Sequence, residues 1–172
     1  MTGSCMHRPS FAACWSAAQR IYEPSNPSDK VARVVGGAVA WNILKAAHSQ
    51  RWRNTCAVRM SYILNHSGLL IPAIPKSTVP GADHRQYFFR ISALKAFLQQ
   101  RWGLADQCLY DPVSGYGFRL SKGILIFDVS GWGDASGHAT LFDGRRCYDQ
   151  CYFNDGGQRR YHVDCASLWN LE

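Results

Sequence analysis

The stretch NTCAVRMSYILN at residues 54–65 decides the fold that we expect for this chain. Apolar side chains surround nearly the whole circumference of the helix that it predicts, which is typical of a buried helix. Asn54 and Thr55 are favourable N-cap residues, so Cys56 falls in the first turn. A thiol there lies at the positive end of the helix dipole, which favours the thiolate and makes it a nucleophile. The alternative is a small buried core cysteine, which is the commoner fate of a free thiol.

A second informative stretch covers residues 138–149. The runs HATLF and RRCYD are strand-like and are joined by Asp143-Gly144, the strongest short signal of a β-hairpin. A two-residue type I′ turn there places His138 directly opposite Asp149, with their Cβ atoms about 5 Å apart on one face of the sheet. A carboxylate that close holds an imidazole in one tautomer and orientation. Without Cys56, the better interpretation of this pair is a structural ion pair across the hairpin.

The two stretches together point to thiol chemistry. The chain order Cys56, His138, Asp149 is that of papain-like enzymes, in which a cysteine nucleophile is activated by a histidine that a third side chain orients. The remaining histidines have no comparable partner in the sequence. We therefore take these three residues as the candidate catalytic set.

The other elements favour an α+β fold. Helices are expected at residues 10–22 and 92–102, the second with Ser92 as its cap and Gly103 as its stop. The apolar run at residues 124–129 predicts a strand in the interior of a sheet. The segment 31–47 is ambiguous, because two adjacent glycines interrupt it.

Length and composition are those of one compact domain. A chain of 172 residues with 47% hydrophobic and 13% aromatic residues can bury a real core, so we expect residues 1–172 to form a single domain. No apolar run is long enough to span a bilayer, and Met1 to Pro9 lacks the apolar region of a signal peptide. Seven cysteines are many for a cytosolic protein, and the odd number leaves at least one unpaired. Delivery to an oxidising compartment without a leader, zinc binding and plain reduced thiols all fit this composition.

The net charge of +7 favours polyanionic surroundings, but no nucleic-acid motif accompanies it. The basic residues are dispersed, with one group at Arg51, Arg53 and Arg59 and two doublets further on. We interpret them as a solvated basic surface and expect no nucleic-acid partner.

Longer motifs around these residues resemble a known family. NTCAVRMSYILN (54–65) resembles the catalytic-cysteine helix of the family-4 amidase effectors of type VI secretion, and GWGDASGHATLF (131–142) with CYDQCYF (147–153) resembles their histidine and aspartate segment. VPGAD (79–83) and RPSF (8–11) also look like the family, so the likeness runs along nearly the whole chain.

The resemblance implies a papain-like fold of the NlpC type, with the catalytic cysteine at the start of a buried helix packed on an antiparallel sheet that carries the histidine and the aspartate. It implies an antibacterial enzyme that needs no cofactor or metal and hydrolyses the peptidoglycan stem peptide between γ-D-glutamate and meso-diaminopimelate. By position, Cys56 is the nucleophile, His138 the base and then the acid, and Asp149 the residue that orients His138. We expect the Cys56 N–H to be one donor to the oxyanion.

The same resemblance implies a place of action and partners. Such effectors are made in the cytoplasm without a signal peptide and are delivered by the type VI secretion machinery to the periplasm of a target bacterium. A cognate immunity protein, usually a dimer, plugs the active-site cleft. No insertion into a membrane is implied.

The C-terminal cysteines leave alternatives open. In one extended strand Cys147 and Cys151 would be about 13 Å apart, too far for a disulfide, so their bond requires a turn directly after Asp149. The family comparison suggests such a small closed loop, and we predict this bond, with Cys151–Cys165 as the alternative. A zinc site built from Cys147, Cys151, His162 and Cys165 has an unusual spacing.

Two other functions remain compatible with the residues alone. The first is another papain-like activity, either a protease or an acyl transferase, since bond specificity depends on the shape of loops. The second is a non-catalytic, zinc-stabilised basic binding module that uses the C-terminal cysteines and surface arginines.

Overall fold

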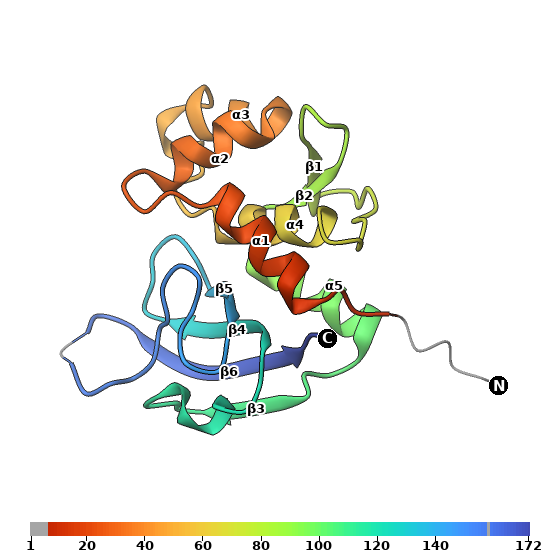
Figure 1. The fold of residues 1–172 in the computed structure, drawn as a ribbon. Coiled ribbons are helices and arrows are strands. Elements are labelled where there is room, and N and C mark those ends of the chain that lie inside the picture. The colour runs from red at the N-terminus through yellow and green to blue at the C-terminus, as the bar shows by residue number, and fades with distance from the viewer. Residues whose placement is uncertain (1–6, 158) are drawn as a thin grey trace.

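A computed structural model describes residues 7–157 and 159–172. A helical layer and a small hairpin lie on one side of the molecule and an antiparallel sheet on the other (Figure 1). The helices are α1 (Phe11–Ile21), α2 (Pro27–Val35), α3 (Gly37–Leu44), α4 (Cys56–Asn65) and α5 (Ile91–Trp102), with 3-10 turns η1 (His48–Gln50) and η2 (Gly115–Phe118). The strands are β1 (Thr78–Pro80), β2 (Gln86–Phe88), β3 (Gln107–Tyr110), β4 (Gly123–Ser130), β5 (Gly137–Phe142) and β6 (His162–Asn170).

Helix α4 is the centre of the helical layer, as its sequence predicts. Every residue from Cys56 to Asn65 is buried, and the helix packs against α1, β2 and β5. The Asn54 side chain rather than that of Thr55 supplies the cap, since Asn54 Oδ1 accepts a hydrogen bond of 3.1 Å from the Cys56 N–H. The prediction that Cys56 opens a buried helix is confirmed.

The remaining helices agree with the sequence pattern in outline. Ser10 caps α1, and the ambiguous segment resolves into α2 and α3 on either side of Gly36. Gly37 has a φ of 58° and lies against the backbone of Gly81, where an added Cβ would come within 2.6 Å, so no larger residue fits. Helix α5 begins one residue earlier than expected, at Ile91, and Ser92 is therefore not its cap.

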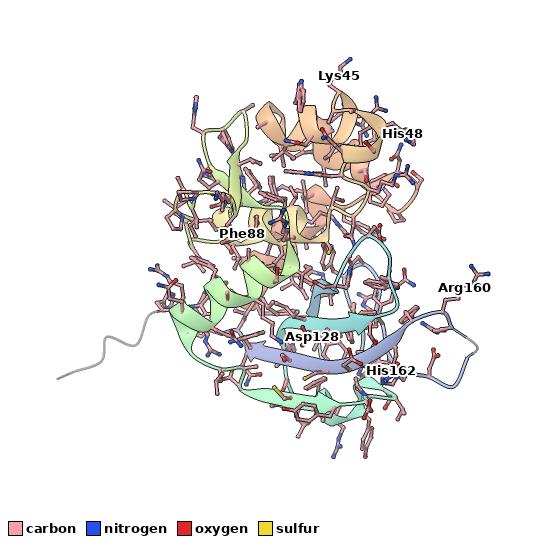
Figure 2. The ribbon with its side chains drawn as sticks, turned by 180° about the vertical axis from the view of Figure 1, so that it is seen from behind. Lys45, His48, Phe88, Asp128, Arg160 and His162 are labelled. Atoms are coloured by element: carbon pink, nitrogen blue, oxygen red, sulfur yellow. A yellow bond between two sulfur atoms is a disulfide. The ribbon has the colours of Figure 1, made fainter. Side chains whose placement is uncertain are left out.

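The sheet has the strand order β3-β6-β4-β5, and each neighbouring pair is antiparallel (Figure 2). The predicted apolar strand is β4, which pairs with β5 and β6 and is buried over most of its length. Side chains of alternate residues point to opposite faces, so the sheet contributes to two cores. Ile124 and Ile126 pack with the helices, while Leu125 and Phe127 pack with the loop that follows β5. Among the described residues no helix is long and apolar enough to cross a membrane.

The predicted turn at Asp143-Gly144 is wrong by one residue. The chain reverses over Gly144 and Arg145: the Asp143 N–H donates to the Arg146 carbonyl over 3.0 Å, and Asp143 Oδ1 accepts from the backbone N–H groups of both arginines. Gly144 takes a φ of 96°, which L side chains rarely adopt. The turn differs because the Asp143 side chain satisfies the N–H groups that a type I′ turn would leave to the backbone.

The shift moves the register by two residues. Phe142 now faces Cys147, and the Tyr148 N–H donates to the Leu141 carbonyl over 3.1 Å, so Asp149 falls opposite Thr140 and not opposite His138. Because side chains alternate with a period of two, an even shift keeps each side chain on its predicted face. Asp149 therefore becomes a diagonal neighbour of His138 on the same face.

The disulfide expected between Cys147 and Cys151 is present, with the two Cα atoms 5.3 Å apart. The alternative partner Cys165 carries a free thiol. The bond also consumes two of the four side chains that the zinc hypothesis requires.

Candidate active site

Cys56 lies at the start of α4, where the helix meets β5. The residue is 2% exposed, and its sulfur is 3.9 Å from the Gly137 carbonyl oxygen. The residue after Gly137 on β5 is His138, whose imidazole and charge act on the thiol and lower the pKa of Cys56. The Cys56 N–H, which we expected to serve an oxyanion, already donates to Asn54 in this structure.

His138 lies between the thiol and a carboxylate and is 4% exposed. Its Nε2 is 3.0 Å from Oδ2 of Asp149, although the N–H does not point straight at that oxygen, so the contact is an ion pair with an imperfect hydrogen-bond angle. The Tyr152 ring packs edge-on against the imidazole, with the ring centroids 4.8 Å apart. Burial lowers the pKa of His138, but Asp149 and then Cys56 outweigh it and raise that pKa to about 9.

Asp149 is held as an anion by several donors. Its Oδ1 accepts from the Thr140 hydroxyl over 2.5 Å and from the Gln150 N–H over 2.6 Å, and its Oδ2 faces His138 and Arg59. Burial raises the pKa of this carboxyl, and the charges and hydrogen bonds around it bring the pKa below its ordinary value. The carboxylate is thus ionised and fixed where it meets the imidazole.

Arg59 is the buried cationic partner of Asp149, contrary to the prediction from the sequence. It was expected on a solvated surface, yet it is 6% exposed and donates from Nη1 to Asp149 Oδ2 over 2.9 Å. Its guanidinium also lies 4.9 Å from the Tyr22 ring centroid and 5.8 Å from that of Tyr148. Arg59 stands three residues after Cys56, so one helix face carries both the thiol and the cation behind the carboxylate. A lone charge on a helix that is otherwise apolar all round is the signal that points to such a buried pair.

The thiol and the imidazole form a charged pair. Burial raises the pKa of Cys56, but the hydrogen bond and the positive charge of His138 outweigh it and lower that pKa. The pKa of the thiol is lowered and that of the imidazole is raised. The proton therefore lies on the imidazole at pH values between these two pKa values. The arrangement can therefore present a thiolate nucleophile beside an acid that is ready to protonate a leaving group.

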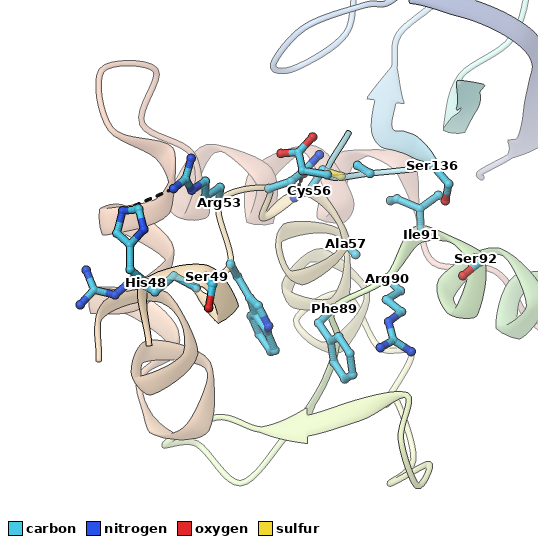
Figure 3. Close-up of a pocket in the computed structure, with 15 residues that line it drawn as sticks. His48, Ser49, Arg53, Cys56, Ala57, Phe89, Arg90, Ile91, Ser92 and Ser136 are labelled. Atoms are coloured by element: carbon cyan, nitrogen blue, oxygen red, sulfur yellow. Dashed lines mark hydrogen bonds between the residues drawn. The ribbon is translucent and has the colours of Figure 1, made fainter. Parts of the chain in front are cut away.

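Two neighbouring cavities reach this pair, and Figure 3 shows the one that contains Cys56. The first, about 490 Å³, is lined by Cys56, Trp52, Phe89 and Arg90 among others. The second, about 400 Å³, is lined by His138, Trp132 and Tyr152 among others. Arg53, Asn54 and Asp134 line both cavities and so mark their junction. An extended chain that crosses this junction meets the thiol and the imidazole in turn.

The charged pair predicts a bell-shaped dependence of kcat/KM on pH. His138 is protonated below its pKa of about 9, and Cys56 is a thiolate only above its lowered pKa. We expect the alkaline limb near pH 9 and an acid limb below the ordinary thiol value, because kcat/KM reports ionisations of the free enzyme. Initial rates across the pH range, at substrate concentrations well below KM, measure both limbs.

The Asp149→Asn variant provides the control for this profile. Asp149 is the charge that contributes most to the raised pKa of His138, so its loss should move the alkaline limb to lower pH. An alkaline limb that stays near pH 9 in the variant would contradict the assignment of that limb to His138.

Opening the disulfide should weaken both the fold and the site. The bond closes a loop with a sequence separation of four residues around Asp149, and the entropy of closing so short a loop corresponds to about 2 kcal/mol of the free energy of unfolding. We expect reduction, or replacement of both cysteines by alanine, to cost that amount and to lower kcat more than it raises KM. Urea unfolding and steady-state kinetics measure the two effects. The free, exposed Cys108 provides the matched control, since Cys108→Ser should change neither.

In the described part of the chain, no three His, Cys, Asp or Glu side chains are grouped as a metal site would require.

Two comparisons with known proteins, one with family models and one with solved structures, agree on one family. Residues 52–169 match the family model described as type VI secretion system amidase effector protein 4, Tae4. The crystal structure of the Tae4–Tai4 effector–immunity complex from Enterobacter cloacae contains a chain 35% identical to this one, with a TM-score of 0.84 and coverage of 96% of this chain and 99% of that one. The Tae4–Tai4 complex from Salmonella Typhimurium gives 31% identity, a TM-score of 0.82 and coverage of 96% and 100%. No match is found among curated proteins.

Proposed function

This chain belongs to the Tae4 family of type VI secretion amidase effectors, and from that premise we propose that it hydrolyses the peptidoglycan stem peptide at the γ-D-glutamyl–meso-diaminopimelate bond by thiol catalysis. Cys56 is the nucleophile, His138 the base and acid, and Asp149 the group that orients His138. The observation that carries the proposal is geometric: a thiol at a helix start lies 3.9 Å from the Gly137 carbonyl, and the next residue, His138, has its Nε2 3.0 Å from a buried carboxylate.

Acylation follows from this geometry. The Cys56 thiolate attacks the scissile carbonyl carbon, and the electron pair of the C=O bond moves to oxygen. When the tetrahedral intermediate collapses, the C–N bond breaks, and the imidazolium of His138 gives its proton to the departing amine of diaminopimelate. The glutamyl group is left as a thioester on Cys56. Asp149 stays ionised throughout and keeps the imidazole in position.

Deacylation uses the same side chains in reverse. Neutral His138 takes a proton from water as the oxygen attacks the thioester, and the released thiolate pairs again with the imidazolium. The Cys56 N–H can serve the developing oxyanion once the Asn54 side chain moves away from it. Thr140 and Arg59 hold Asp149 in both stages and touch no reacting atom.

Family membership also supports a proposal about the partner of this enzyme and its place of action. Two relatives were crystallised in complex with the immunity protein Tai4. We propose that a cognate immunity protein, as a dimer, closes the cleft at Cys56 of this chain. We place the action of the enzyme in the periplasm of a target bacterium, where peptidoglycan is accessible and a disulfide persists. The chain acts as a single domain over residues 1–172.

Digestion of defined stem peptides tests the bond. The wild-type enzyme should convert L-alanyl-γ-D-glutamyl-meso-diaminopimelate into a dipeptide and free diaminopimelate, identified by mass spectrometry. The matched control is the same peptide with its glutamate linked through the α-carboxyl, which should remain intact. Cleavage at any other bond, or equal cleavage of both peptides, would overturn the proposed specificity.

A further inference from the structure

The cavity beside Cys56 carries an excess of positive charge. Three arginines, Arg51, Arg53 and Arg90, line it against one carboxylate, Asp134. Within the described residues, none of the three arginines has a carboxylate within 4.0 Å. Clustered cations without counter-ions in a cavity favour an anionic ligand.

Arg90 differs from the other two arginines. Arg51 donates through Nε to the Ala46 carbonyl, and Arg53 approaches His48 at 3.4 Å and also lines the second cavity. Of the two cavities, Arg90 lines only the one that contains Cys56. Its guanidinium donates no hydrogen bond to another described residue. Its N–H groups are therefore free to bind a planar anion through two parallel hydrogen bonds.

The surroundings of Arg90 hold it on the cavity wall. Its guanidinium lies 5.1 Å from the centroid of Phe89, whose ring stacks on Trp52 at 5.0 Å. The next residue, Ile91, packs against Gly137, whose carbonyl is the one that lies 3.9 Å from the Cys56 sulfur. Figure 3 shows Arg90 and Ile91 on the same side of Cys56, with Arg53 on the opposite side. Arg90 thus lies on the wall of the cavity that contains Cys56. In this structure its guanidinium points toward Phe89 and away from the sulfur, and because the residue is exposed, the side chain is free to turn toward Cys56.

The two cavities also determine how a substrate lies. The scissile carbonyl carbon must sit on the Cys56 sulfur, and the leaving nitrogen must face His138 to receive its proton. The first cavity is lined by Cys56 but not His138, and the second by His138 but not Cys56. The acyl half of the substrate therefore occupies the cavity that carries Arg90, and the amine half occupies the cavity that carries Trp132.

The acyl half of the proposed substrate has a matching charge. A glutamyl residue linked through its γ-carboxyl keeps its α-carboxylate free, within one side-chain length of the scissile carbonyl. We infer that Arg90 binds this α-carboxylate and makes the enzyme select a γ-linked acidic residue as the acyl donor, with Arg51 and Arg53 adding to the positive field. This inference rests on the proposed function and adds to it the group that recognises the acyl donor.

Amidation of that carboxylate is the direct test. The probes are the stem tripeptide with a free α-carboxylate and the same peptide with an α-carboxamide, which has nearly the same shape but no charge. We expect wild type to prefer the acid by about 10- to 100-fold in kcat/KM, as expected for a hydrogen-bonded ion pair. Arg90→Gln should lose that preference through a slower reaction of the acid, while its rate on the amide stays within about twofold of wild type.

The control is an arginine in a similar setting outside the cavity. Arg119 is exposed and lies 4.2 Å from the Tyr116 ring centroid, as Arg90 lies on Phe89, so Arg119→Gln should retain the full preference. Equal cleavage of acid and amide by wild type, or an unchanged preference in Arg90→Gln, would overturn the inference and leave the proposed function intact. Failure of wild type to cleave either peptide would overturn the proposed function and the inference with it.

Discussion

Replacing Cys56 by alanine should abolish turnover and leave the fold in place. The side chain is small and buried, so its loss removes few contacts, and we expect the free energy of unfolding to fall by about 1 kcal/mol. The reaction, in contrast, loses the only group that can form the thioester, and kcat should fall by at least about 10⁴-fold. Release of diaminopimelate from the stem tripeptide measures the rate, and thermal unfolding measures the fold.

Cys14 provides the matched control for that variant. It is a second fully buried, free cysteine, and burial raises its pKa to about 11, so it is a protonated thiol at neutral pH. Cys14→Ala should cost a similar amount of stability and retain full turnover. Substantial activity in Cys56→Ala would exclude Cys56 as the nucleophile, whereas inactivity of both variants would point to damage of the fold.

Replacing Arg59 by leucine should have the largest effect on stability. Asp149 would lose one of its donors while remaining buried, and a buried ion pair broken on one side typically costs about 3–5 kcal/mol. The folded pKa of Asp149 lies below its ordinary value, so this group stabilises the fold at neutral pH and loses that contribution as the pH falls through its folded pKa. Without Arg59 that pKa should rise, and the acid-dependent loss of stability should begin at a higher pH.

Urea unfolding at neutral and acidic pH measures both parts of this prediction. The ion pair of Arg33 with Asp29 on α2 is the matched control, since both side chains are largely exposed. Arg33→Leu should change the free energy of unfolding by no more than about 1 kcal/mol. Arg59→Lys should fall between the two, because it keeps the charge but loses the planar group that lies against Tyr22 and Tyr148. Equal costs for Arg59→Leu and Arg33→Leu would contradict a structural role for the buried pair.

The parts of the fold that depend on local patterns could be predicted from the sequence. The continuous apolar surface around Cys56 identifies a buried helix without any knowledge of its neighbours, and the apolar run of β4 identifies an interior strand in the same way. The exact turn at Gly144 could not be predicted, because the Asp143 side chain competes with the backbone for the same N–H groups. The face on which Asp149 lies was nevertheless predicted correctly, because a register shift of two residues leaves each side chain on the same face of a strand.

Features that form where distant segments meet could not be predicted from local sequence patterns. The charge of Arg59 predicts a solvent-exposed side chain. Its burial is explained by its ion pair with Asp149, which lies far away in the sequence. The cavity with Arg90 is formed where the loop before α4 meets the start of α5 and the loop before β5, and no spacing in the sequence signals that meeting. The family resemblance supplied the expected chemistry but gave no role to either arginine.

The disulfide loop has a consequence for aggregation that is separate from catalysis. Strand β5 lies at the edge of the sheet, and the short segment around Cys147 covers part of that edge through the bridge with Phe142 and the hydrogen bond to Leu141. Exposed strand edges are templates on which other chains can pair. By tying Cys147 to Cys151, the chain keeps that segment against β5. A molecule in which the bond is open presents a free, apolar strand edge and should self-associate more readily than the oxidised form.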